Sequence, residues 1–281
     1  MTRHLYQMNG LGKGTFSAMR GNDTNKKDIM AYSRLKAFSA VLLILILFPL
    51  VTVAAPLELE DGMGEFTPGA SMRLLEDERA NLTLDEAVSL LSRQGEVWES
   101  RGFPTLGFTS SAYWASIDIS NDYASDQVWL AKLDYATIDR IDFYFRDVNG
   151  DWVEKSAGDT LAFTNRDVMH HSISFKFPVL ASQPQTLYFR VQSEGSVQLP
   201  LYLSSLEDFQ LTSTNEYIWI GAYYGLMLLI ALYSAFIWLA SKDKSYLYFV
   251  FFILSGGLFS FSFQGLSFQF LWPDIPYWAN R

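Results

Sequence analysis

The chain lacks cysteine entirely, since none of its 281 residues is a cysteine. This absence excludes a disulfide framework and every metal site that uses thiolate ligands. Any soluble domain must therefore be stabilised by a hydrophobic core. Roughly 150 residues lie between the first and second long apolar stretches, which is enough for one domain with its own core.

Histidine is scarce, and the common catalytic motifs are missing. The histidines are His4, His170 and His171, and the sequence has no G-x-S-x-G, no H-E-x-x-H, no phosphate-binding loop and no dinucleotide fingerprint. We therefore expect no catalytic residues, no enzyme activity in this chain and no cofactor. An enzyme acting on glycans outside the cell stays open as an alternative, because it needs paired carboxylates whose separation a sequence does not give.

Two short patterns resemble metal sites, and neither predicts one. His170 and His171 are adjacent in a segment that we expect to be a strand, where neighbouring side chains point to opposite faces. Residues 147–151 (DVNGD) resemble the opening of a calcium loop, but Glu154 comes too early to close it. A hairpin turn already explains Asn149-Gly150. We therefore expect no bound metal.

Positive charge is also scarce in the stretch that follows the first apolar run. The net charge is −9, and acidic residues outnumber basic ones roughly two to one between Pro56 and Ser213. An acidic surface disfavours nucleic acid and anionic lipid headgroups. We therefore expect no nucleic-acid partner.

The first apolar stretch runs from Ala37 to Val53 and is followed by Ala54 and Ala55. The basic residues shortly before it are Lys26, Lys27, Arg34 and Lys36. A basic segment, a short apolar run and small residues at a cleavage site are typical of a secretory signal. Pro56 disfavours cleavage directly before it, so we expect cleavage after Ala54, with an uncleaved anchor as the alternative. Met30 would begin a signal of ordinary length.

Alternation with a period of two dominates the middle of the chain. Residues 83–86 (TLDE) form a capping box that predicts a short helix ending near Gly95. After Gly107, apolar residues alternate with polar ones in several short segments, which predicts strands. The clearest alternations are Ile141, Phe143 and Phe145, then Ile173, Phe175 and Phe177, then Leu187, Phe189 and Val191. The pattern predicts an all-β jelly roll or β-sandwich with a short helix. We expect no core to start between Pro56 and Gly69, which has the composition of an extended linker or first edge strand.

Two further apolar stretches, 217–239 and 246–270, contain no charged residue and can each cross about 30 Å of hydrocarbon. Lys242 and Lys244 in the short loop between them predict a cytoplasmic loop. The sandwich and the C-terminal end then lie outside the cytoplasm. A small-xxx-small spacing from Gly221 to Gly225 favours packing within one helix bundle and leaves a homodimer through the membrane helices open.

These patterns divide the chain into eight segments. We expect an N-terminal extension and signal peptide (1–55), a linker or edge strand (56–73), an extracytoplasmic β-sandwich sensor domain (74–205), a connector (206–216), a first transmembrane helix (217–239), a cytoplasmic loop (240–245), a second transmembrane helix (246–270) and an extracytoplasmic tail (271–281).

Aromatic and basic residues on the polar faces of the predicted strands are candidates for ligand binding. The opposite faces of those strands already supply a core, so these side chains are not needed for it. Aromatic rings cover the apolar faces of sugars, and arginine orients hydroxyl or acid groups. The ligand-binding candidates are Tyr144, Arg146, Trp152, Tyr188 and Arg190. For Trp98, Tyr113 and Trp114 we expect packing instead.

Three stretches of sequence carry a family resemblance. They are LLEDERANLTLDEAVSL, FPTLGFTSSAYWASIDISN (103–121), and KDKSYLY (242–248) opening a span that ends in GLSFQFLWPDIPYWANR. Together they resemble the bacterial seven-transmembrane receptors with diverse intracellular signalling modules (7TMR-DISM), in the second type of extracellular domain and the first two of the seven helices. The resemblance begins at about Leu74.

This resemblance implies a jelly-roll domain that binds carbohydrate or another small ligand, seven helices, and an output module such as a diguanylate cyclase or a histidine kinase. The sequence stops at Arg281, so we expect a truncated product or a fragment. We expect the sensory part of a receptor in the bacterial inner membrane, with its sensor domain in the periplasm and contacts to membrane lipid. A non-signalling envelope or glycan-binding module is the first alternative, and an accessory subunit of a transporter or enzyme is the second.

Overall fold

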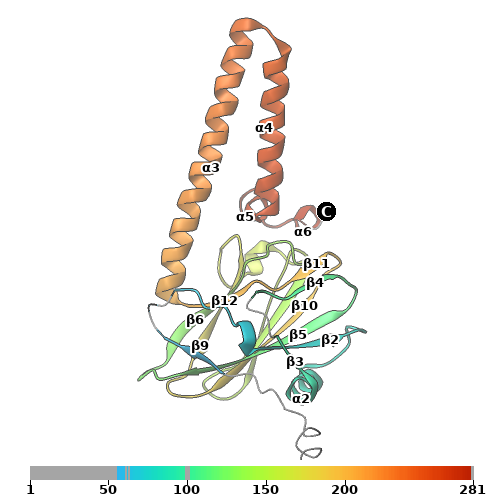
Figure 1. Ribbon diagram of the computed structural model, residues 1–281, viewed down its shortest axis with the longest axis vertical. Coiled ribbons are helices and arrows are strands. Elements are labelled where there is room, and N and C mark those ends of the chain that lie inside the picture. The colour runs from blue at the N-terminus through green and yellow to red at the C-terminus, as the bar shows by residue number, and fades with distance from the viewer. Residues whose placement is uncertain (1–55, 61, 63, 99–101, 280–281) are drawn as a thin grey trace, which may run out of the picture. The chain divides into compact units, whose positions relative to one another are not determined.

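The computed structural model describes residues 56–60, 62, 64–98 and 102–279, which form a β-sandwich followed by two long helices (Figure 1). All of these residues belong to one compact unit, 53–281. The expected signal peptide and its cleavage position lie outside the described residues. The all-β sandwich with a short helix, followed by two apolar helices, is confirmed.

The sandwich is built from one large and one small sheet, with a separate two-stranded ribbon. The large sheet has the order β3 (Glu96–Val97), β2 (Met72–Asp77), β5 (Ala112–Asn121), β10 (Gln185–Gln192), β7 (Arg140–Arg146) and β8 (Trp152–Ala157), with β1 (Leu57–Leu59) parallel to β5. The small sheet has the order β12 (Leu201–Ser205), β6 (Gln127–Leu133) and β9 (Ile173–Val179). The ribbon pairs β11 (Ser196–Gln198) with β4 (Thr105–Phe108).

The core lies between the inner faces of the two sheets, where the alternating apolar residues meet. Phe143 of β7 stacks on Phe189 of β10 at 4.7 Å between ring centroids, and it also contacts Phe175 and Phe177 of β9. All four rings are at most 1% exposed. The three clearest alternations of the sequence therefore lie in the core, as predicted.

The segment before residue 69 contributes to this core, contrary to expectation. Strand β1 pairs with the end of β5, where Leu57 lies opposite Ile119, and Leu59 is only 2% exposed. Phe66 forms a backbone bridge to Leu203. The expectation that no core starts there is wrong, because Leu59 is part of the core. The sequence did not indicate this, since a strand of three residues is too short to show an alternation.

A short helix covers part of the outer face of the large sheet. Helix α2 (Leu84–Gln94) begins with the expected capping box between Thr83 and Glu86. It buries Ala87 and Leu91 against Trp114 of β5. Trp114 is thus a packing residue, as the sequence predicted.

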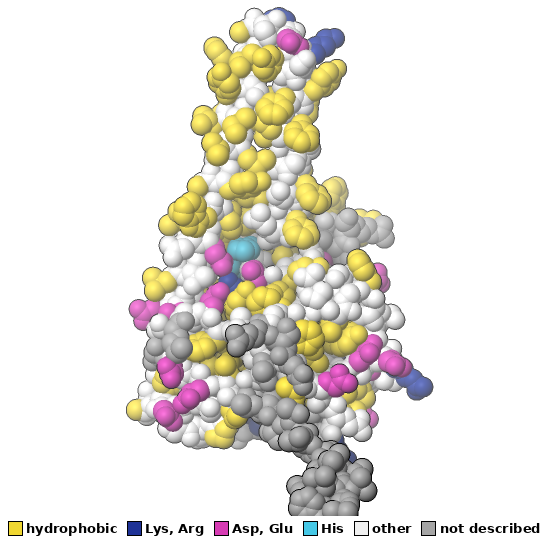
Figure 2. Space-filling view, viewed as in Figure 1, with side chains coloured by type: hydrophobic (Ala, Val, Ile, Leu, Met, Phe, Trp, Pro, Cys, Tyr) yellow, Lys and Arg dark blue, Asp and Glu magenta, His cyan; other side chains and the backbone are white. Residues whose placement is uncertain are grey.

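Two long apolar helices follow the sandwich, α3 (Leu206–Ser241) and α4 (Lys244–Phe263). Only 11% and 6% of their most apolar windows are buried, so they are not core helices of a soluble domain. Figure 2 shows hydrophobic side chains along both helices and charged ones at the loop that joins them. They are the two candidate membrane spans among the described residues.

Helix α3 is longer than a membrane requires. Its 36 residues extend about 54 Å, against about 30 Å of hydrocarbon. The expected connector 206–216 is therefore helical and continuous with the span. These first turns contact β6 and β12, and they bury Phe209.

The segment after α4 returns to the sandwich. Gly265, at φ 77°, separates α4 from α5 (Leu266–Phe270), so the continuous helix ends before residue 270. A Cβ on Gly265 would lie 2.6 Å from the Cβ of Ala136, so only glycine fits there. The N–H of Phe163 donates to the carbonyl of Pro273 at 2.8 Å, before the last turn, α6 (Pro276–Ala279). Residues 265–273 thus lie on the sandwich side of the spans.

Candidate functional site

The five ligand-binding candidates share the outer face of the large sheet. Tyr188 lies opposite Tyr144 in the pairing of β10 with β7, and Arg146 lies opposite Trp152 in the pairing of β7 with β8. Arg190 lies two residues after Tyr188 and so projects from the same face. This common face follows from the alternation, since the intervening residues fill the core.

Three of the five line one cleft. Arg146, Trp152 and Tyr188 border a cavity of about 460 Å³ at the end of the sheet formed by the β7–β8 turn and the segment before β10. The guanidinium of Arg146 lies 4.2 Å from the Trp152 ring centroid. The Trp152 ring meets Tyr188 edge to face at 5.7 Å. The volume falls within the usual range for small-molecule sites, and the rings are half-buried.

The β7–β8 turn forms one wall of this cleft and is held by hydrogen bonds within the turn. The amides of Asn149 and Asp151 each donate to Oδ1 of Asp147 at 2.9 Å, and Gly150 adopts φ 85°. The amide of Asp151 and then that of Asn149 hold the pKa of Asp147 below its usual value. The expected hairpin turn is confirmed, and this carboxylate is already used by the turn.

Tyr144 and Arg190 lie outside the cleft. Tyr144 stacks on Trp114 at 5.7 Å and donates its hydroxyl to Glu154 at 3.3 Å. Burial raises the pKa of Tyr144, so it remains a phenol. Arg190 pairs with Asp142 at 3.6 Å and donates to the carbonyl of Ala80 at 3.2 Å. Both side chains are therefore used in contacts within the protein, Tyr144 with Trp114 and Glu154, and Arg190 with Asp142 and Ala80.

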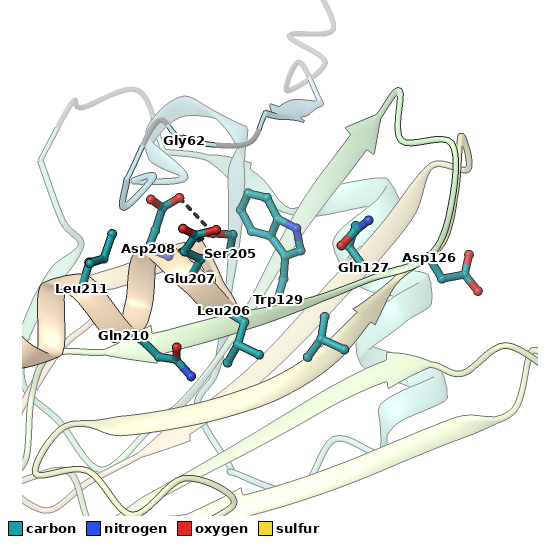
Figure 3. Close-up of a pocket in the computed structure, with 11 residues that line it drawn as sticks. Gly62, Asp126, Gln127, Trp129, Ser205, Leu206, Glu207, Asp208, Gln210 and Leu211 are labelled. Atoms are coloured by element: carbon teal, nitrogen blue, oxygen red, sulfur yellow. Dashed lines mark hydrogen bonds between the residues drawn. The ribbon is translucent and has the colours of Figure 1, made fainter.

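A larger hollow of about 1060 Å³ lies where α3 begins (Figure 3). Its charged lining is acidic, from Asp126, Glu207 and Asp208. Ser205 caps the helix there, since its hydroxyl accepts from the amide of Asp208 at 3.1 Å and donates to the Asp208 carboxylate at 2.9 Å. Trp129, which also borders the hollow, is fully buried. Helix capping and core packing explain these side chains without a ligand.

A cluster of charged and histidine side chains, which the sequence analysis did not identify, lies where α3 contacts the small sheet. Lys132 of β6 is 1% exposed, and its Nζ pairs with Glu65 at 2.7 Å and with Glu216 of α3 at 2.8 Å. The Nε2 atoms of His170 and His171 lie 3.7 and 3.6 Å from Oε2 of Glu216. Figure 2 shows histidine beside acidic side chains in this region. We call these residues, Glu65, Lys132, His170, His171 and Glu216, the junction cluster.

The expectation that the two histidines point to opposite faces is wrong. Strand β9 begins only at Ile173, and the histidines lie in the bend before it, with their ring centroids 4.3 Å apart. Nη1 of the buried Arg166 donates to the carbonyls of His170 and His171, at 2.9 and 3.0 Å, and so fixes the bend. Alternation applies only inside a strand, which is why the sequence argument fails here.

Burial governs the protonation of the groups around this bend. Burial, and then the neighbouring His171, lower the pKa of His170 to about 3, so its imidazole is neutral at pH 7. Burial, and then the charge of Asp139, raise the pKa of Asp159 to about 7. Burial lowers the pKa of Arg166 to about 10. The region therefore holds ionisable groups that water hardly reaches.

The sandwich and the two apolar helices define the class of the protein, which is a membrane protein with an extracellular domain. The family model described as 7TMR-DISM extracellular 2 matches residues 69–205, and the model described as 7TM diverse intracellular signalling matches residues 216–281. The chain belongs to the 7TMR-DISM family of membrane sensor receptors, as its sequence resemblance indicated. No curated protein matches the chain.

Solved structures similar to the chain have low identity. A β-glucosidase from Kluyveromyces marxianus in complex with glucose has 7% identity and a TM-score of 0.32 over 50% of this chain, which spans only 18% of that enzyme. TmCBM61 in complex with β-1,4-galactotriose has 10% identity and a TM-score of 0.26, over 49% of this chain and 91% of that one. A family 11 carbohydrate-binding module from Clostridium thermocellum, in complex with a mixed-linked tetrasaccharide, has 8% identity and a TM-score of 0.24, over 52% and 91%. Because these scores are low, the ligands of those proteins carry no argument here.

Proposed function

We propose that this chain is the N-terminal sensory part of a bacterial receptor, and that its sandwich binds a small, sugar-like ligand in the cleft of Arg146, Trp152 and Tyr188. One observation carries the proposal. Three residues chosen from the sequence as free of the core line one cavity of about 460 Å³. The sandwich lies in the periplasm, the helices cross the inner membrane, and the output module lies outside this chain.

The cleft has the two kinds of surface that sugars need. The rings of Trp152 and Tyr188 supply apolar area against the carbon faces of a pyranose. The exposed Arg146 guanidinium supplies several N–H donors for hydroxyl or carboxylate oxygens. The cleft is therefore suited to a neutral or acidic sugar better than to a cation.

The strand order offers a route from this cleft to the membrane. Strand β9 runs from the histidine bend to the cleft end of the sandwich, a distance of about 20 Å for its seven residues. Strand β8 begins at Trp152 and leads to Asp159 and Phe163, and the ring of Phe163 packs on Phe268 of α5 at 5.5 Å. A ligand changes helix packing only if it binds two arrangements with different affinity. We propose that these strands carry that difference.

The proposal is tested on the full chain in lipid nanodiscs with a panel of glycans and sugar acids. A ligand that binds the folded state raises the midpoint of thermal unfolding. For a ligand so found, Trp152→Ala and Tyr188→Ala should weaken binding at least about ten-fold, a loss of about 1.4 kcal/mol. Phe108→Ala is the matched control, since this aromatic side chain is 84% exposed on β4 outside the cleft. Equal affinity in all four proteins would place the ligand elsewhere.

A further inference from the structure

Three polar atoms of the junction cluster converge without a hydrogen bond among the residues that the structure describes. They are Nε2 of His170, Nε2 of His171 and Oε2 of Glu216, each shielded from solvent. His170 and His171 are 3% and 8% exposed. One ligand atom from each of the three residues lies within 4.8 Å of the other two. Buried polar atoms are normally paired with protein, water or an ion, so these three convergent atoms form a candidate site for an ion.

The separations fit two ligands of one metal ion better than a hydrogen bond. The distances from the two Nε2 atoms to Oε2 of Glu216 are 3.7 and 3.6 Å. Both are longer than an ordinary N–H···O hydrogen bond, which measures about 2.7–3.2 Å. Two ligands at about 2.0–2.1 Å from a tetrahedral zinc ion lie about 3.3–3.4 Å apart. A hydrogen bond joins only two atoms, whereas a metal ion can bind all three of the atoms that converge here. A small contraction of the junction cluster would bring all three into range of one ion.

We propose that His170, His171 and Glu216 form a binding site for a divalent transition-metal ion of the zinc class, which joins the sandwich to α3. Imidazole nitrogens and a carboxylate oxygen are ligands that such ions accept. A cavity of about 530 Å³ adjoins the site and is bordered by His171, Glu216, Trp219 and Gln264. This cavity leaves a fourth coordination position for water or for a ligand from outside.

The hydrogen bonds at the Nδ1 atoms of the two histidines indicate which of them is the stronger metal ligand. The Ser172 hydroxyl donates its proton to Asp134 at 2.9 Å, so at its 3.4 Å contact with Nδ1 of His171 it can only accept. Nδ1 of His171 then carries the proton, and its Nε2 keeps a lone pair for the metal. Nδ1 of His170 accepts from the Ser172 amide at 3.2 Å, and this contact must be lost when Nε2 of His170 coordinates. His171 and Glu216 are therefore the stronger ligands.

The neighbouring charges leave one carboxylate oxygen for a cation. Lys132 pairs with Oε1 of Glu216, the oxygen that does not face the histidines. Glu65 pairs with the same ammonium group at 2.7 Å, so Lys132 is already balanced by two carboxylates. Glu65, Lys132 and Glu216 together carry one excess negative charge, which favours a cation beside Oε2 of Glu216. The site is separate from the cleft of Arg146, Trp152 and Tyr188.

The experiment uses the full chain in detergent, stripped of metal with a chelator and titrated with Zn²⁺ by calorimetry. We expect one saturable site that disappears with His171→Ala or Glu216→Gln. Ser172→Ala keeps every ligand but removes the contact that orients His171, so it should weaken binding about 10- to 100-fold, and by less than His171→Ala. Glu207→Gln is the matched control, because Glu207 is an exposed acid on the same helix. Its affinity should be unchanged.

Several results would overturn the site. They are the absence of saturable zinc binding, a zinc affinity that His171→Ala leaves unchanged, or an equal loss with Glu207→Gln. A thermal midpoint that zinc does not shift would also reject the proposal. If Glu216→Gln does not fold by circular dichroism, His171→Ala decides. Cobalt absorption adds an independent reading, since tetrahedral Co²⁺ bands should appear in the unmodified chain and be lost in His171→Ala.

Discussion

The two ends of strands β7, β8 and β9 differ in how their polar groups are satisfied. At the cleft end, Arg146 donates to the carbonyl of Gly150 and covers Trp152, and both side chains remain open to solvent. At the membrane end, one atom each of His170, His171 and Glu216 is shielded from solvent and has no hydrogen bond among the described residues. The cleft offers surface to a ligand, whereas the junction cluster offers charge to an ion. One end thus suits reversible recognition, and the other suits a fixed link to α3.

The largest expected effect comes from the core that both ends share. Phe175→Ala should cost about 3 to 5 kcal/mol, because the ring is 1% exposed and packs on Phe143. Urea unfolding of the full chain in detergent, followed by tryptophan fluorescence, measures it. Phe108→Ala, at an exposed position, should stay within about 0.5 kcal/mol. A near-neutral Phe175→Ala would mean that the inner face is assigned incorrectly.

The membrane end should make stability depend on pH through Asp159. Its folded pKa is raised to about 7, above its unfolded value, so its protonation favours the folded state. That contribution is present at about pH 4 and is lost as the pH rises through 7, at up to about 1.4 kcal/mol per pH unit. Asp159→Asn should remove this part of the slope and be more stable than the unmodified chain at pH 8. Parallel profiles of the two proteins would contradict the assignment.

Lys132 provides a somewhat smaller effect at the same end. Lys132→Met removes the cation between Glu65 and Glu216 and leaves two carboxylates uncompensated, at a cost of about 3 kcal/mol at pH 7. Burial raises the pKa of Glu216, and the hydrogen bond from Lys132 helps to lower it. Without Lys132 that pKa should rise, so stability should recover as the pH falls. Urea midpoints from pH 4 to 8 check this. A loss that is independent of pH would indicate that Lys132 contributes packing alone.

The smallest expected effect comes from Tyr144 and Arg190, which lie on the outer face of the large sheet but outside the cleft. Tyr144→Phe removes the hydroxyl that donates to Glu154 and should cost about 1 kcal/mol or less. It should leave the affinity for a cleft ligand unchanged, because Tyr144 stacks under α2 on Trp114. Arg190→Lys should behave likewise. Weakened ligand binding in either variant would extend the site beyond Arg146, Trp152 and Tyr188.

The sequence predicted the parts of the fold that follow from local periodicity. Alternation placed Phe143, Phe175 and Phe189 in the core, and a capping box placed the start of α2 at Thr83. The parallel pairing of β1 with β5 was not predictable, because Leu57–Leu59 is too short to show a period and its partner is distant in the chain. Sheet order has no signal in a single sequence.

The candidate site was only partly predictable for the same reason. Alternation identified which face Tyr144, Arg146, Trp152, Tyr188 and Arg190 occupy, but not which of them helix α2 covers. The junction cluster joins residues from four distant segments, so no spacing could reveal it. Two weak signals existed, namely a lysine at position 132 in a mostly apolar strand and Glu216 immediately before an apolar stretch. Neither indicates a partner on its own.

Hydrogen–deuterium exchange of the full chain in nanodiscs, with and without a bound sugar ligand, tests the central claim most directly. If the cleft binds the ligand and the strands couple it to the helices, protection should increase at residues 146–152 and 180–188, and exchange should also change at 158–172 and at 209–217. Protection confined to other surfaces, or a cleft response with no change at 158–172 and 209–217, would contradict the account.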